Sequence, residues 1–126
     1  AVLGGRRAST PITEDEPKKI TGKWMITGWN PGADTTGAAH YKGTVEVAQK
    51  GEKGCYTVLW KIGKAVQPGI GVYDAKTGVL ATAYVASNGK PTVVLYRPDE
   101  SGEKLLGFWT MGGVLTKPAG RENWSR

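Results

Sequence analysis

The sequence has a single cysteine, a single histidine and a single phenylalanine. With Cys55 alone, no disulfide can form within the chain and no zinc site can rest on cysteine thiolates. With His40 alone, a catalytic triad would have to use that one residue, and a histidine-rich metal site is excluded. No apolar run is long enough for a membrane-spanning helix. We therefore expect no metal, no cofactor and no membrane-spanning helix.

A helical period is also missing, because no segment of about ten residues repeats apolar positions on one helical face. What is abundant instead is glycine, with 19 residues in a chain of 126, and it follows no collagen-like repeat. The glycines punctuate short apolar runs and so mark turns. Five tryptophans and five tyrosines favour strands. The length predicts one domain with a core of its own.

The clearest local pattern is a β-hairpin over residues 41–60, with the sequence YKGTVEVAQKGEKGCYTVLW. Val45 and Val47 share one face of the first run, and Val58 and Trp60 share one face of the second. The segment 49–54 between them holds two glycines that can adopt positive φ. A lone hairpin is marginally stable in water, so its apolar face must be covered by further strands.

The rest of the chain supplies such strands. Ser87-Asn88-Gly89-Lys90 is typical of a tight hairpin turn. Residues 63–68 are interpreted as a connection between the hairpin and the next strand. Residues 120–126 are expected to form a last short strand or to lie across the barrel mouth. Besides the hairpin, strands are predicted over residues 21–29, 69–73, 79–85, 92–97 and 104–110.

Seven to eight short strands joined by tight turns can close in two ways, as a barrel or as a two-sheet sandwich. Tight hairpins make sequence neighbours spatial neighbours, and closure removes the edge strands. We therefore predict an all-β protein, an antiparallel meander of seven to eight strands closed as an up-and-down barrel, with a β-sandwich as the alternative.

The first 19 residues lack periodicity and are predicted to form a flexible arm, which leaves residues 20–126 as a single barrel domain. The net charge of +6 comes from lysines and arginines scattered through the chain. This pattern favours solubility and edge protection over an acidic partner, and without an RNP or OB signature we do not expect nucleic acid. The chain begins with Ala rather than Met, which fits a processed precursor or a trimmed chain, and we expect a secreted or periplasmic protein.

The segment Thr21-Gly22-Lys23-Trp24 resembles the Gly-x-Trp motif that opens lipocalins and, as Thr-Gly-x-Trp, avidin-type barrels, together the calycin group. The chain is also similar to small bacterial proteins with repeated Tyr-x-Gly, Tyr-x-Val-x-Trp and Leu-x-Gly-x-Trp elements. The calycin resemblance implies that Trp24 closes one end of the barrel and packs on a basic residue near the chain end, Arg121 or Arg126. We expect Arg121 in that role. The lipocalin cysteine pair and C-terminal helix are missing, so biotin or retinoid binding is not carried over.

No group of residues has the pattern of a catalytic site. His40 lies in a polar loop, and Cys55 alternates with Leu59 as a small packed residue of a strand. Glu46 and Glu52 belong to a polar strand face and to a turn, so they do not form a pair for glycoside hydrolysis. We therefore predict a protein that is not an enzyme, with no catalytic and no metal-binding residues.

The aromatic residues offer a better lead, because they recur near strand centres and ends and can either fill a core or line a pocket. The first hypothesis is an exported binding module that holds a small apolar or amphipathic ligand in the barrel. The second is a protein-interaction or assembly module, a subunit or an inhibitor, that acts through its loops and the N-terminal arm and could be oligomeric. The predicted ligand-binding residues are Trp29, Tyr41, Tyr56, Trp60, Tyr73, Tyr84, Tyr96 and Trp109.

Overall fold

The structure, a computed structural model, describes residues 20–126, so the predicted arm over residues 1–19 lies outside the described residues. Eight strands follow one another with almost no helix between them. Their bounds are β1 Gly22–Trp29, β2 Tyr41–Gln49, β3 Cys55–Ile62, β4 Ala65–Asp74, β5 Val79–Val85, β6 Pro91–Pro98, β7 Leu105–Met111 and β8 Gly120–Ser125. Within residues 20–126, no helix is long and apolar enough to cross a membrane.

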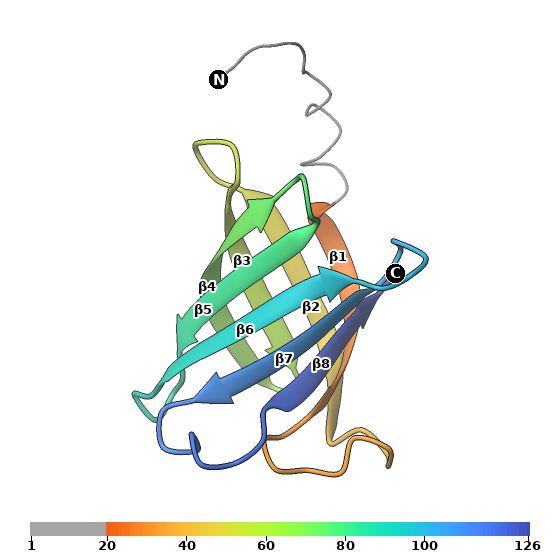
Figure 1. Cartoon of the computed structure of the whole chain (residues 1–126). Coiled ribbons are helices and arrows are strands. Elements are labelled where there is room, and N and C mark those ends of the chain that lie inside the picture. The colour runs from red at the N-terminus through yellow and green to blue at the C-terminus, as the bar shows by residue number, and fades with distance from the viewer. Residues whose placement is uncertain (1–19) are drawn as a thin grey trace.

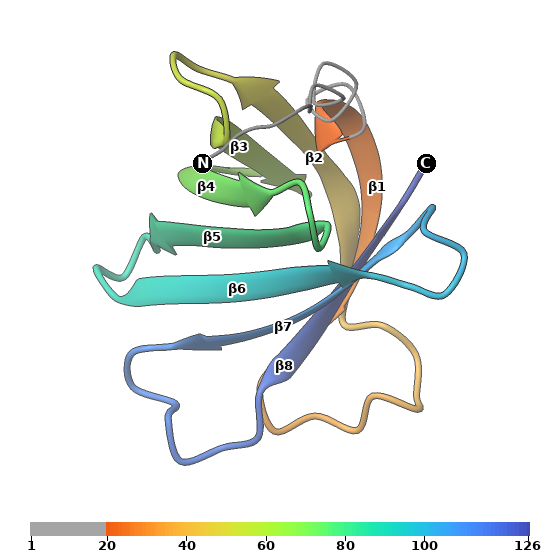
Figure 2. The ribbon, with the colours of Figure 1, turned by 45° about the horizontal axis from the view of Figure 1, so that its top comes forward.

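Each strand pairs antiparallel with the next, and β8 returns to pair with β1, which closes the sheet into a barrel (Figure 1). The closing register runs from Met25 opposite Ser125 to Trp29 opposite Arg121. The up-and-down barrel is therefore confirmed over the sandwich, and residues 120–125 form a strand rather than a cover for the mouth. Figure 2 shows the same succession of strands around the barrel from a tilted direction.

The alternation seen in the sequence becomes an inside and an outside. Val45 and Val47 of β2, together with Val58 and Trp60 of β3, are buried in the barrel, while their neighbours along each strand are largely exposed. The register pairs Val45 with Trp60 and Val47 with Val58, as expected for the hairpin over residues 41–60. Burial of these apolar side chains is the main force that closes the sheet.

The prediction for residues 63–68 was wrong, because β4 begins at Ala65 and only Gly63 and Lys64 form the turn. Gly63 has φ +59°, a left-handed conformation that suits a two-residue hairpin turn. Pro68 is accommodated because β4 pairs there with β3 alone, and the ladder to β5 starts only at Ile70. The Gln67 amide donates to the Val85 carbonyl at 3.1 Å instead.

One end of the barrel, here called the closed end, is where β1 begins and β8 finishes, together with the turns 50–54, 75–78 and 99–104. Trp24 is buried there, with its ring centroid 5.8 Å from that of Trp124. The guanidinium carbon of Arg126 lies 3.8 Å from the centroid of the Trp24 ring. The Trp24 indole donates to the Ile20 carbonyl at 3.0 Å. Aromatic rings and a stacked cation thus cover this end.

The expectation that Arg121 packs on Trp24 was wrong, because Arg126 has that position. Arg121 is an exposed residue near the start of β8, opposite Phe108 and Trp29, at the other end of the barrel. Arg126 follows the last strand, and its Nη1 donates to the Thr21 carbonyl at 2.9 Å. Arg121 alternates with the inward-facing Gly120 and Glu122 and so points outward, whereas Arg126 follows Trp124 at the end of the barrel where Trp24 lies.

Candidate functional site

The opposite end, here called the mouth, is bounded by the loops 30–40, 63–64, 86–90 and 112–119, at the bottom of Figure 1. It contains a pocket of about 320 Å³. Of the eight predicted aromatic residues, four line this pocket, and they come from four different strands. The lining residues are Asn30, His40, Tyr41, Trp60, Ile62, Ala65, Gln67, Tyr84, Trp109 and Glu122.

The wall of the pocket includes a charged residue that points into the barrel. Glu122 shares the inward face of β8 with Gly120 and Trp124 and is only 4% exposed. Its Oε1 accepts a hydrogen bond from the Tyr41 hydroxyl at 2.8 Å. Its Oε2 accepts from the indole N–H groups of Trp60 and Trp124, both at 2.9 Å, and from the Tyr96 hydroxyl. Strands β2, β3, β6 and β8 therefore meet at one carboxylate.

All of these donors are neutral groups, and indole N–H groups can only donate. Burying a carboxylate is costly unless hydrogen bonds replace its hydration, which this arrangement provides. No lysine or arginine belongs to the lining of the pocket among residues 20–126. The carboxylate is thus held by hydrogen bonds and has no cationic side chain from this lining beside it.

The tyrosines around Glu122 remain protonated over a wide pH range. Burial, followed by the charge of Glu122, raises the pKa of Tyr41 far above its usual value near 10. The same two causes raise the pKa of Tyr96 well above that value, and they also raise the pKa of Tyr84. A phenol that keeps its proton can keep donating to the carboxylate, so the network is stable through neutral pH.

Glycines make room for two aromatic walls. A Cβ at Gly28 would lie 1.9 Å from the Tyr41 ring, and a Cβ at Gly120 would lie 2.7 Å from Nε1 of Trp109. Real Cβ atoms do not approach other heavy atoms so closely, so both rings need glycine on the adjoining strand. The missing side chains on β1 and β8 thus allow Tyr41 and Trp109 to lie flat against the inside of the barrel.

The indole N–H of Trp109 is buried and has no hydrogen-bond partner within the described part of the chain. Trp109 also lowers the pKa of Tyr41, an effect smaller than those of burial and Glu122. On the other wall, the Trp60 and Tyr84 rings lie 4.9 Å apart between centroids, with a tilt of 52°. The pocket therefore offers aromatic surface on several sides.

The rim of the pocket is formed by the loop after β1. His40 Nδ1 accepts a hydrogen bond from the Asn30 backbone N–H at 3.3 Å. The backbone N–H of His40 donates to the Gly28 carbonyl at 2.8 Å. The Trp29 indole donates to the Gly37 carbonyl at 3.0 Å, which fastens the middle of the loop. Trp29 therefore supports the rim and does not line the pocket.

Three more of the predicted binding residues lie away from the pocket. Tyr96 is fully buried behind it, with its ring centroid 4.2 Å from that of Trp124. Tyr56 and Tyr73 stack edge to face toward the closed end, with centroids 6.2 Å apart. Their side chains fill the barrel, while Tyr41, Trp60, Tyr84 and Trp109 are the members of the predicted set that share one pocket.

Sequence reasoning missed Glu122, which holds the network together. A usable signal was present, because Glu122 alternates with Trp124 and so belongs to the same strand face. Metal binding finds no support in the geometry of residues 20–126, where no three His, Cys, Asp or Glu side chains cluster. The prediction that Cys55 is a packed residue was wrong, because Cys55 is exposed at the start of β3, far along that strand from the mouth.

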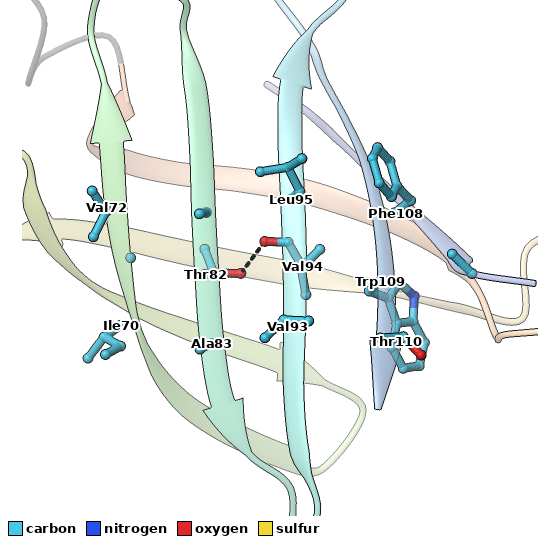
Figure 3. Close-up of a pocket in the computed structure, with 13 residues that line it drawn as sticks. Ile70, Val72, Thr82, Ala83, Val93, Val94, Leu95, Phe108, Trp109 and Thr110 are labelled. Carbon is cyan, nitrogen blue, oxygen red and sulfur yellow. Dashed lines mark hydrogen bonds between the residues drawn. The ribbon is translucent and has the colours of Figure 1, made fainter. Parts of the chain in front are cut away.

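A second hollow, of about 490 Å³, lies on the outside of the barrel over β4 to β7 (Figure 3). Side chains from β4, β6 and β7 rise around the small Ala83 on β5 in this view. Ile70 and Val72 are more than 60% exposed, which confirms that they point away from the core. Trp109 borders both this outer hollow and the mouth pocket, and the lining of the outer hollow includes no charged residue.

No protein-family model and no curated protein sequence matches the chain. Its structure is similar to the apo form of lipid binding protein 8 from Caenorhabditis elegans, with a TM-score of 0.54 and 12% identity over 94% of this chain and 99% of that one. It is also similar to the wild-type fluorescent protein UnaG, with a TM-score of 0.51 and 18% identity over 86% of this chain and 98% of that one. These likenesses support a calycin-type barrel fold, and kinship with lipocalins or avidins in particular stays a prediction.

Proposed function

We propose that this protein is a non-enzymatic binding module that holds a small amphipathic molecule with a positively charged group in its mouth pocket. Ligand binding in a barrel is consistent with the likeness to a lipid-binding protein of similar fold. The observation that carries the proposal is the combination of aromatic walls with a buried carboxylate and no lysine or arginine in the pocket lining.

The charge preference follows from two attractive effects. A cation over the faces of Trp60, Tyr84 or Trp109 interacts favourably with their π systems, most strongly when it is desolvated. The negative charge of Glu122 adds a Coulomb attraction that the low dielectric of the barrel strengthens. An organic ammonium group suits both effects, because its alkyl substituents also bury apolar surface against the rings.

The same charge disfavours an anion. A carboxylate ligand in this pocket would face Glu122, and like charges repel strongly where water is excluded. We therefore expect the pocket to reject simple fatty acids, even though a barrel of similar fold belongs to a lipid-binding protein. Selection by charge distinguishes this proposal from a pocket that recognises apolar surface alone.

Binding is favoured over catalysis because the titratable groups of the pocket are already engaged. The oxygens of Glu122 accept hydrogen bonds from side chains of four strands, so the carboxylate already serves to join these strands. His40 uses Nδ1 to accept a backbone N–H. Secretion or a periplasmic location remains a prediction from the sequence.

The test compares three probes of nearly equal shape and different charge: choline, the neutral 3,3-dimethylbutan-1-ol and the anionic 3,3-dimethylbutanoate. Each is titrated into the protein at neutral pH while indole N–H signals are followed by NMR. We expect choline to bind at least about tenfold more tightly than the neutral isostere, as one desolvated cation–π contact of about 1.4 kcal/mol requires. Equal or tighter binding of the anion would contradict the proposal.

A pair of variants checks the location. Tyr84→Leu removes one aromatic wall of the mouth and should weaken choline binding, whereas Tyr73→Leu removes a tyrosine that packs on Tyr56 away from the mouth. Both tyrosines are half-buried, so the two substitutions are comparable in kind. If both variants bound choline as the original chain does, the mouth would not be the binding site.

A further inference from the structure

The outward side chains of β4 to β7 form a continuous apolar surface, here called the outer face. Ile70 is 66% exposed, Val72 63% and Val93 54%, and Leu95 and Phe108 are each 39% exposed. Figure 3 shows these residues on three strands around the hollow. Monomeric proteins rarely expose large contiguous apolar patches unless these bind something.

The other side of the barrel is different. There, β1, β2 and β3 carry the exposed charged residues Lys23, Lys42, Glu46 and Lys61, and Lys61 pairs with Glu46 at 3.3 Å. The outward positions of the outer face that lie near the middle of β4 to β7 carry no charge. This asymmetry cannot come from solubility alone, which would favour charges on both sides.

The outer face also has a distinctive relief. On β5, the small residues Ala81 and Ala83 point outward, and they are paired with Leu95 and Val93 of β6 on one side. On the other side they are paired with Val72 and Ile70 of β4. The result is a valley along β5 between two ridges of larger side chains, which is the hollow seen outside the barrel.

We propose that the outer face binds the outer face of a second copy of this chain. A two-fold axis parallel to the strands and between β5 and β6 places the β6 ridge of each copy over the β5 valley of the other. Val93 and Leu95 of each copy then lie over Ala83 and Ala81 of the other copy. Large side chains thus pack against small ones, and symmetry repeats this contact. The same patch serves both subunits, as an isologous interface requires.

Charges at one margin of the outer face support this choice of partner. Asp74 pairs with Val79, and the next residue, Leu80, pairs with Tyr96, so Asp74 and Arg97 lie at nearly the same level on either side of β5. Both are exposed. The two-fold axis brings Arg97 of each copy over Val79 of the other, next to Asp74 of that copy. Each Arg97 then lies one strand spacing from Asp74 of the other copy and one strand spacing from that copy's Arg97, so two guanidinium groups and two carboxylates gather at this margin with no net charge.

The size of the outer face sets the expected affinity. Four strands spaced about 4.8 Å apart and about 20 Å long form a plane of roughly 400 Å². Two such faces bury roughly 800 Å² in total, less than the range of about 1,200 to 2,000 Å² for stable interfaces, so we expect a weak, transient dimer with a dissociation constant of tens to hundreds of micromolar. The dimer should therefore form as concentration rises.

The first experiment is sedimentation velocity on the full chain from about 1 to 500 µM, a range that brackets a micromolar equilibrium. Val93→Lys places two unpaired charges in each dimer interface and should raise the dissociation constant at least about 100-fold. Met25→Lys is the matched control, since Met25 is also 54% exposed but lies on β1, on the other side of the barrel. It should leave the equilibrium unchanged.

The second experiment tests the charged margin. Arg97→Asp and Asp74→Lys should each weaken self-association, because like charges then meet across the axis. An equimolar mixture of the two variants should recover a heterodimer, in which both contacts are attractive again. Recovery on mixing separates contact between copies from any effect within one copy, including the hydrogen bonds that Asp74 makes in its own turn.

A monomer at every concentration would overturn the proposal, even if the protein then bound lipid vesicles or another protein through the same surface. A dimer that Val93→Lys does not weaken would also overturn it, because another surface would then form the contact.

Discussion

The two ends of the barrel contain similar aromatic groups in opposite electrostatic settings. At the closed end, Trp24 packs on Trp124 and is covered by the guanidinium group of Arg126. At the mouth, Trp60 and Trp109 border a pocket that has a buried carboxylate and, within residues 20–126, no lysine or arginine in its lining. The closed end thus supplies its own cation, whereas the mouth leaves a comparable position for a ligand.

The comparison shows that aromatic side chains of one barrel can fill one end of it and line a pocket at the other. Trp124 belongs to both, because its ring packs on Trp24 and its N–H donates to Glu122. The hydrophobic effect favours filling both ends equally. At the mouth, the polar network around Glu122 holds two of the four aromatic wall residues, Tyr41 and Trp60, by hydrogen bonds.

The largest effect should come from removing the centre of the network. Glu122→Ala leaves four donors in the barrel without their acceptor, at about 1 to 3 kcal/mol for each buried donor. We expect a loss of at least about 4 kcal/mol in the free energy of unfolding, measured by urea denaturation. Glu46→Ala, which removes an exposed carboxylate, should cost less than about 1 kcal/mol. Similar losses for the two variants would contradict the role of the network.

The closed end should be next in sensitivity. Trp24→Ala removes a buried ring and should cost about 3 to 5 kcal/mol in the free energy of unfolding. Arg126→Ala, which uncovers that ring but leaves it in place, should cost about 1 kcal/mol or less. A loss below about 1 kcal/mol for Trp24→Ala would show that this ring does not close the barrel.

Alkaline pH should destabilise the folded protein through the tyrosines that donate to Glu122. In the unfolded chain tyrosines ionise near pH 10, while the raised pKa values of Tyr41 and Tyr96 keep both protonated in the folded protein. The folded state then binds more protons than the unfolded one, so this stability is complete below pH 10 and falls above it. The slope should be about 1.4 kcal/mol per pH unit for each tyrosine. Urea denaturation between pH 8 and about 11 measures it. Tyr41→Phe should flatten the slope by one such contribution, and an unchanged slope would refute this explanation.

The smallest effect should distinguish two indoles of the mouth. Trp60→Phe loses a hydrogen bond to the Glu122 carboxylate and should cost about 1.5 to 3 kcal/mol in the free energy of unfolding. Trp109→Phe loses an N–H without a partner in the described chain and should change that free energy by less than about 1 kcal/mol. Thermal or urea denaturation of the two variants, side by side, tests this. A larger loss for Trp109→Phe would mean that its N–H has a partner in solution.

Much of the fold could be predicted because it follows from local alternation. The hairpin over residues 41–60 and the buried Trp24 both depend on short patterns that fix which face of a strand is apolar. The first residues of β4 were missed, because they pair with β3 alone and the ladder to β5 starts only at Ile70, which no local pattern reveals.

The site could be predicted only in part. Aromatic residues were the right class, but Tyr56 and Tyr41 look alike in the sequence and lie at different depths along the barrel. Glu122 was missed because a carboxylate on an inward strand face is ordinarily too costly. The groups that make it tolerable come from strands far away, with Tyr41 81 positions and Trp60 62 positions earlier in the chain.

The closure of β1 on β8 has a consequence for the order in which the protein can be assembled. Met25 and Ser125 are paired, so the hydrogen bonds on one edge of β1 can form only after β8 has been synthesised. Contacts between such distant parts of a chain slow folding, because a large loop must close before they form. Until β8 is synthesised, a sheet of β1 to β7 has two unpaired edges, at β1 and β7, and lacks the Glu122 carboxylate. The nascent chain is therefore most exposed to misassociation just before its last six-residue strand leaves the ribosome.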